Sequence, residues 1–186
     1  MSIKSTAIGL GIGVMMCTAA MAAGPYSYGY GSEYNGVYFG ASAGEVLYSE
    51  QGLSQMAPTI LLFHIGQQFS PFVAIEGRVG TSVNGGNADG YRINAQLLYA
   101  GYIKGMLPLN PWVAPYALLG LGGAQWHRNY PDFNSNDVGI SFGIGSEFYL
   151  GGGASLNLEW ARLNTGNNVG YDYTADQLTF GVNWRL

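Results

Sequence analysis

The sequence has little charge, almost no cysteine and few long hydrophobic runs. Only 10% of its 186 residues are charged, whereas about 25% is typical of soluble domains. Its one cysteine, Cys17, lies near the amino terminus, in a segment with the pattern of a signal peptide. The mature chain would then hold no disulfide, no thiolate metal site and no cysteine nucleophile. After that segment no run of about 20 apolar residues follows, which argues against a helical membrane protein.

The amino-terminal stretch MSIKSTAIGLGIGVMMCTAAMAAG predicts export. Lys4 precedes an apolar run, and Ala20-Met21-Ala22 forms a small-x-small cleavage site. We therefore expect residues 1–22 to be a signal peptide that is cleaved after Ala22 or Ala23. Loss of Lys4 would change the formal charge from −4 to −5. This acidity disfavours nucleic acid as a partner.

Glycine and aromatic residues are abundant in the sequence. Glycine accounts for 30 of the 186 residues, and aromatic residues make up 14%. Many apolar and aromatic residues, few charges and no long apolar run together favour a transmembrane β-barrel. In such a barrel, lipid-facing and lumen-facing side chains alternate along every strand.

Eight segments alternate between apolar and polar residues with a period of two, which predicts strands. In the last one, TFGVNWRL, apolar residues alternate with small or polar ones up to the final Leu186. The predicted strands cover residues 37–46, 59–69, 72–81, 91–105, 112–125, 138–150, 154–163 and 177–186. We predict an all-β fold, an eight-stranded antiparallel up-and-down transmembrane β-barrel over residues 37–186. A Tyr/Gly-rich segment, 23–36, precedes it.

The predicted connections alternate between long and short. Bacterial outer-membrane barrels show this asymmetry, with short periplasmic turns and longer external loops. An even number of strands lets the first and last strands pair, which removes the open edges. The alternative is a soluble, lipocalin-like barrel, whose polar outer face would call for more charge. The predicted external loops are residues 47–58, 81–90, 126–137 and 163–176.

Five segments, taken in order, resemble the OmpA-like family of small outer-membrane barrels. They are GVYFGASAG, GQQFSPFVAIEGRVG, YIKGMLPLNPWVAPYALLGLGG, GIGSEFYL and LNLEWARLN, and together they span almost the whole mature chain. No peptidoglycan-binding domain follows them, as in OmpX-type members. The resemblance implies the outer membrane of a Gram-negative bacterium, with outer-membrane lipid and lipopolysaccharide around the barrel.

The resemblance also gives the last strand a role. In this family the terminal strand carries a signal for the barrel-assembly machinery, of the form polar-x-Gly-x-x-aromatic-x-hydrophobe. Here those positions are Thr179, Gly181, Trp184 and Leu186. Leu186 stands where the family usually ends on Phe.

The lumen of an eight-stranded barrel is just wide enough to be filled by side chains. The predicted inward positions carry seven charged residues, Glu76, Arg78, Arg92, Lys104, Glu147, Glu159 and Arg185, the last near the periplasmic end. Unpaired buried charges cost several kcal/mol, so we expect pairing.

The resemblance assigns Glu76, Lys104 and Glu147 to an internal salt-bridge network of the family. Leu118 and Asn157 stand where relatives carry arginine. Arg78 or Arg92 would substitute for the missing arginines, or a gate would be absent. A structural plug and a switchable ion gate both stay open as interpretations.

We predict no catalytic, cofactor or metal site, because two isolated histidines make no such constellation. His64 is expected in the lumen as a hydrogen-bonded core residue, and His127 in a loop. Outer-membrane lipid A deacylases are also small eight-stranded barrels, but they use a His-x-Ser pair. This chain has His64-Ile65-Gly66 and His127-Arg128-Asn129 instead.

Aromatic residues are expected to form girdles at both membrane interfaces. We predict Trp112 and Trp184 at the periplasmic interface, and Tyr91, Trp126 and Trp160 toward the outer one.

We therefore expect a non-enzymatic membrane scaffold that displays four external loops. Aromatic and acidic residues in the last two loops favour adhesion or host contact: Tyr130, Asp132, Phe133, Tyr171, Asp172 and Tyr173. Solvated loops without a partner would explain the same residues. The alternatives are a narrow porin-like channel for small solutes or ions, gated by the lumen charges, and a lipid-modifying enzyme.

Overall fold

The computed structural model describes residues 36–50, 55–88, 91–129, 132–168 and 171–186. The predicted signal peptide and almost all of the Tyr/Gly-rich segment lie outside these residues. Within the described part of the chain, every regular element is a β-strand. No helix there is both long enough and apolar enough to cross a membrane.

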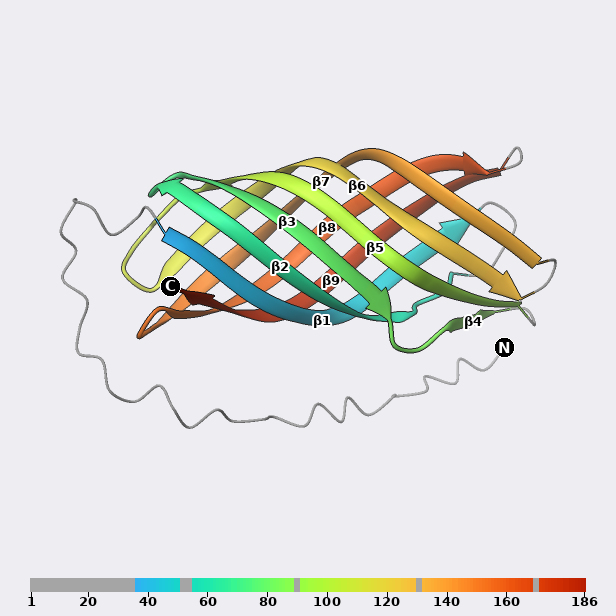
Figure 1. Ribbon diagram of the computed structural model, residues 1–186, viewed down its shortest axis with the longest axis horizontal. Helices are drawn as coiled ribbons and strands as arrows, with labels where there is room; N and C mark the ends of the chain where they lie inside the picture. Colours follow the sequence, from blue (N-terminus) through green and yellow to red (C-terminus); the bar gives the residue numbers. More distant parts are fainter. Residues whose placement is uncertain (1–35, 51–54, 89–90, 130–131, 169–170) are drawn as a thin grey trace, which may run out of the picture.

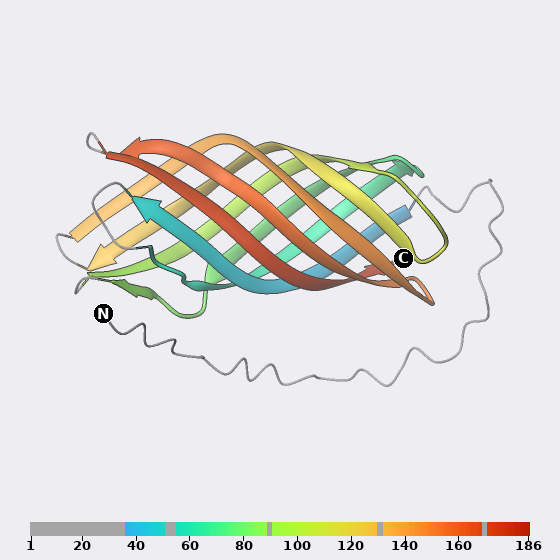
Figure 2. The same cartoon turned by 180° about the vertical axis from the view of Figure 1, so that it is seen from behind.

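The strands form one antiparallel sheet that closes on itself (Figures 1 and 2). Their order is β3-β2-β1-β9-β8-β7-β6-β5-β4, and a further pairing of β3 with β5 completes the cylinder. This confirms the predicted eight-stranded barrel, because the three-residue β4 only adds to the edge of β5. The strands are β1 (Gly36–Glu50), β2 (Thr59–Ser70), β3 (Val73–Ser82), β4 (Gly86–Ala88), β5 (Tyr91–Met106), β6 (Val113–Asn129), β7 (Asp132–Gly151), β8 (Ala154–Asn168) and β9 (Tyr171–Arg185).

The two ends of the barrel differ. The connections β2–β3, β5–β6 and β7–β8 lie at the same end as the carboxyl terminus (Figure 1). We call this the turn end, and the opposite end, where β6–β7 and β8–β9 are joined, the hairpin end.

Two of the predicted external loops are wrong, because residues 126–137 and 163–176 are largely strand. The β6–β7 ladder continues to the pair Asn129 and Asp132, and the β8–β9 ladder to Asn168 and Tyr171. A hairpin that extends beyond the bilayer has water on both faces. The apolar–polar alternation therefore stops there while the backbone hydrogen bonds continue.

A β-bulge in β5 changes which side chains point inward. The register with β6 shifts between Ala95 and Leu97. Ala95 is buried and Gln96 is exposed, whereas a constant alternation through the predicted inward positions Arg92 and Lys104 would place Ala95 outside and Gln96 inside. An extra residue in one strand moves every following side chain to the other face, so a constant period of two fails across the bulge.

The outer wall is apolar and the interior is divided into two layers. Large hydrophobic side chains such as Phe63, Ile103 and Ile140 are exposed on the wall, as a lipid-facing surface requires. Inside, buried charged and polar side chains occupy the half nearer the turn end. A cluster of buried apolar side chains fills the half nearer the hairpin end.

Candidate functional site

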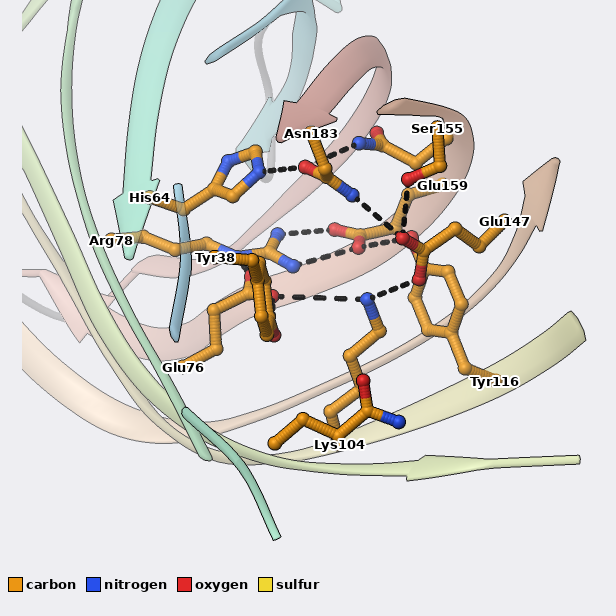
Figure 3. A network of polar contacts seen from close by, with 12 residues as sticks. Tyr38, His64, Glu76, Arg78, Lys104, Tyr116, Glu147, Ser155, Glu159 and Asn183 are labelled. Atoms are coloured by element: carbon orange, nitrogen blue, oxygen red, sulfur yellow. Dashed lines mark hydrogen bonds and ion pairs between the residues drawn. The ribbon is translucent and has the colours of Figure 1, made fainter. Parts of the chain in front are cut away.

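Five charged residues on four strands meet in the lumen and form the charged layer (Figure 3). Period-two alternation along each strand directs every one of these side chains inward. They are Glu76 and Arg78 on β3, Lys104 on β5, Glu147 on β7 and Glu159 on β8.

Arg78 connects two of the carboxylates. Its Nε donates a 2.6 Å hydrogen bond to Oε1 of Glu76. Its Nη2 donates a 2.8 Å bond to Oε2 of Glu159, and its Nη1 donates to Oε1 of the same carboxylate. The planar guanidinium suits such two-pronged binding. Its Cζ also lies 4.9 Å from the ring centre of Tyr102, within the range of a cation–π contact.

Lys104 lies between the other pair of carboxylates. Its Nζ is 3.1 Å from Oε2 of Glu147 and 3.8 Å from Oε2 of Glu76. The same Nζ lies 4.2 Å from the ring centre of Tyr116. Glu76 is therefore shared between Lys104 and Arg78, and this sharing joins the ion pairs into one network.

Three glutamates face two cations in this layer, and neutral groups donate further hydrogen bonds to the carboxylates. Tyr38 Oη donates to Glu76 at 2.6 Å, and Tyr116 Oη donates to Glu159 at 2.9 Å. Ser155 Oγ donates to Glu147 at 2.5 Å. Buried carboxylates are stable only when such bonds satisfy their remaining lone pairs.

His64 lies at the edge of the network as a hydrogen-bonded lumen residue. Its Nε2 contacts Oδ1 of Asn183. Because an amide oxygen only accepts hydrogen bonds, Nε2 is the donor here. Asn183 Nδ2 in turn donates to Glu147 at 3.1 Å. Asn183 therefore links the histidine to the acids.

Two other predicted lumen charges do not join this network. Arg185 donates from Nη2 to Gln68 Oε1 at 2.6 Å, near the turn end. The backbone of Arg92 in β5 pairs with that of Asn87 in β4. The Arg92 side chain lies outside the described residues.

Leu118 and Asn157, which stand where relatives carry arginine, are uncharged residues of the interior. Leu118 is buried in an apolar cluster with Tyr102 and Tyr116. Asn157 donates to Asn183 at 3.3 Å. Arg78 supplies the guanidinium that pairs with the lumen acids in the part of the chain that the structure describes.

The layer toward the hairpin end is apolar, which sequence reasoning missed. We call it the apolar layer. The rings of Tyr48 and Trp126 meet at its centre, with their centroids 5.1 Å apart. Met56 joins them from beyond β1, because its backbone bonds to that of Tyr48 at 2.8 and 3.0 Å. The layer consists of Val46, Tyr48, Met56, Ile60, Leu62, Ala95, Leu98, Ala124, Trp126, Leu163 and Ala175.

Trp126 is therefore not the outward girdle residue that we predicted. It is buried, because β6 continues to Asn129 and the inward alternation of Tyr116, Leu118, Gly120 and Gly122 runs on through Trp126. Extending that alternation by four residues would have shown this. The described girdle candidates at the turn end, Trp112 and Trp184, are exposed on the wall, and Trp160 is half-buried.

The charged groups of the lumen are bonded to one another. Among the described residues, no group of three or more His, Cys, Asp or Glu side chains could hold a metal ion. Each of the three lumen carboxylates is engaged by a cation and a neutral donor.

Solved structures share the fold. The surface protein NspA of Neisseria is 14% identical with a TM-score of 0.61, over 81% of this chain and 97% of that one. Ail, the attachment invasion locus protein of Yersinia pestis, seen in complex with the heparin analogue sucrose octasulfate, is 12% identical with a TM-score of 0.59, over 82% and 99%. OprG of Pseudomonas aeruginosa is 10% identical with a TM-score of 0.57, over 82% and 97%.

Two comparisons of the sequence bear on the family. No curated protein sequence matches the chain significantly. The family model of the outer membrane protein beta-barrel domain matches residues 9–185. Together with the closed eight-stranded barrel, this match shows that the chain belongs to the outer-membrane β-barrel family.

Proposed function

We propose that this protein is a non-enzymatic, non-conducting outer-membrane barrel that holds long hairpins at the cell surface. The observation that carries the proposal is the filled interior. A solute that crosses the lumen would have to pass the charged layer and then the apolar layer, both built from buried side chains. An eight-stranded barrel has no further width to offer.

The ion-gate alternative is less well supported by this arrangement. A gate at Lys104 and its carboxylates would open only the half of the lumen nearer the turn end. Beyond it, Tyr48, Trp126 and Met56 would still exclude water. Hydrophobic constrictions of this kind block ions by dewetting.

Planar-bilayer conductance of the refolded mature protein, residues 23–186, tests this proposal. We expect a silent bilayer for the wild type and for Lys104→Met, with folding confirmed by heat-dependent gel mobility. Discrete openings that change in Lys104→Met would contradict the proposal and support the channel. An altered lipid A mass in cells that make the protein would support an enzyme instead.

The hairpins are the part that we propose to contact other molecules. The solved structure of Ail shows a protein of this fold with a heparin analogue. The four predicted loop segments of this chain carry six acidic residues and one arginine, a formal charge of −5. We therefore infer a basic or neutral partner, because a polyanion would be repelled. The tip residues that suggested adhesion, including Tyr130 and Tyr173, have side chains outside the described residues.

Surface binding by whole cells tests this role. We expect replacement of the acidic residues Asp132, Asp137 and Asp172 by asparagine to leave the barrel intact and reduce attachment to cationic surfaces, because it removes negative charge from the hairpins. Equal attachment by the variant and the wild type would overturn it. Lipopolysaccharide and the barrel-assembly machinery are the further partners that we propose, from the membrane position and from the terminal strand.

A further inference from the structure

The lipid-facing wall has a groove that the proposed function does not use. It occupies about 980 Å³ and extends on the outside of the barrel from β1 across β2, β3, β5 and β6 to β7. Its walls are the exposed aliphatic side chains Ile65, Ile75, Ile103, Leu119, Leu121 and Ile140. No charged side chain projects into it, since Glu76, which borders it, is turned into the lumen and is buried.

Two paired glycines form the floor of the groove. Gly77 of β3 lies opposite Gly101 of β5 in the ladder. On the other side, Gly77 pairs with Ile65 of β2, and Gly101 pairs with Leu121 of β6. A Cβ added at Gly77 or Gly101 would meet no atom within 4 Å, so both positions face open space outside the wall. Glycine in a strand often marks a place where another molecule comes close to the backbone.

The two ends of the groove differ in polarity. One end is formed by Val37 and Gln67. Gln67 lies three residues before the end of β2. Because the strand is tilted, this places Gln67 about 8 Å from the turn end, measured along the barrel axis. The opposite end is formed by Leu121 and Ile140, and Val138, the next outward residue of β7, is also apolar and exposed.

We propose that this groove binds an acyl chain of a phospholipid from the leaflet at the turn end, which is the periplasmic leaflet. The chain lies over Gly77 and Gly101, between the aliphatic walls. Its glycerol ester lies near the Gln67 amide, the outward-facing polar group among the residues that line the groove. A lipopolysaccharide chain would enter from the other leaflet, and that end of the groove offers no polar group.

A second copy of the barrel fits the groove less well. The wall of a barrel is convex, and a two-fold contact places the same patch of both copies face to face. Two opposed depressions would leave an unfilled space at the glycines. Such a void loses dispersion contacts on both sides. A flexible acyl chain can fill the depression and is already present around the barrel.

Native mass spectrometry of the protein purified from outer membranes tests the proposal, with dioleoyl phosphatidylethanolamine added to the detergent. The groove is filled in the variant Gly77→Leu/Gly101→Leu. Gly105→Leu is the matched control, because Gly105 also faces open space but lies outside the groove. We expect the wild type and the control to retain one phospholipid. The double variant should bind it about tenfold more weakly, which corresponds to about 1.4 kcal/mol.

Three results would overturn the proposal. Equal phospholipid retention by all three proteins would mean that the groove is not a site. Loss of a dimer peak in the double variant would mean that the groove is a contact between copies. Preference for purified lipid A over the phospholipid in competition would place the ligand in the wrong leaflet. Gly101→Leu alone, with folding checked by heat-dependent gel mobility, replaces the double variant if the latter does not fold.

Discussion

Arg78 and Glu159 form a two-pronged ion pair that crosses the lumen from β3 to β8. These strands are not neighbours in the sheet, since β2, β1 and β9 lie between them. Ladder hydrogen bonds connect only adjacent strands. The pair therefore ties two opposite walls of the barrel, and the side chains of Arg78 and Glu159 are only 8% and 2% exposed.

Arg78→Met is expected to destabilise the barrel by about 3–5 kcal/mol, because it leaves a buried carboxylate without its cation. The measurement is urea-driven unfolding in lipid vesicles, followed by tryptophan fluorescence. Arg162→Met is the control, since its pair with Asp176 is 33% and 21% exposed and such pairs contribute at most about 1 kcal/mol. Equal losses in the two variants would contradict the prediction.

A double variant separates lost charge pairing from lost packing. Arg78→Met/Glu159→Gln removes the uncompensated charge while it keeps the shape of the acid, so we expect it to regain about half of the stability that Arg78→Met loses. Additive losses, measured in the same unfolding experiment, would mean that the two residues act independently.

Trp126→Ala tests the apolar layer. Removing this buried ring leaves a cavity beside Tyr48, and the expected loss is about 3–5 kcal/mol. Gel mobility without heating, across a urea series, reports folding without relying on tryptophan emission. The control is Trp112→Ala, which removes a ring that is 62% exposed on the outer wall. It leaves no internal cavity, so it should cost less than half as much.

Alternation along single strands predicted the barrel and the inward direction of several lumen residues. Glu76, Lys104, Glu147 and Glu159 all occupy inward positions of regular strands. Alternation does not predict which of these lumen residues form ion pairs with one another. Arg78 and Glu159 are 81 residues apart, and their meeting depends on the register of every strand between them.

The errors arose where the alternation is interrupted or ends. The bulge beside Gln96 adds one residue to β5, so Ala95 and Gln96 face opposite to the directions extrapolated along the strand from Lys104. Past the bilayer, the β6–β7 and β8–β9 ladders continue without an apolar face to reveal them. The apolar layer was missed for a related reason. Trp126 and Met56 belong to segments whose sequence indicates loops, and a loop pattern assigns no residue to the interior.

Gly145→Ala tests how tightly the charged layer is packed. A Cβ at this position would lie 2.5 Å from Cζ of Tyr116, whose hydroxyl donates to Glu159. The ring must move, so we expect overpacking to cost about 1–3 kcal/mol. Gly105→Ala, which meets nothing within 4 Å, should leave the urea midpoint unchanged. An unchanged midpoint in Gly145→Ala as well would show that Tyr116 can shift without losing its bond.

Leu186→Ser separates assembly from stability. The Leu186 side chain is 82% exposed, and the residue is attached through its backbone N–H, which donates to the Val37 carbonyl at 2.9 Å. Serine keeps that backbone bond and removes only the terminal hydrophobe of the predicted assembly signal. We therefore expect normal refolding in detergent but a reduced amount of protein in the outer membrane of growing cells.

The control for this variant is Leu150→Ser, an exposed apolar position at the same end of the barrel. It removes a similar side chain outside the signal, so its level in the outer membrane should stay close to that of the wild type. Immunoblots of fractionated membranes measure both variants. If both fall equally, the terminal leucine contributes only general hydrophobicity and is not read by the assembly machinery. If only Leu186→Ser falls while its refolding in detergent is unchanged, the last residue is a recognition element whose effect precedes folding.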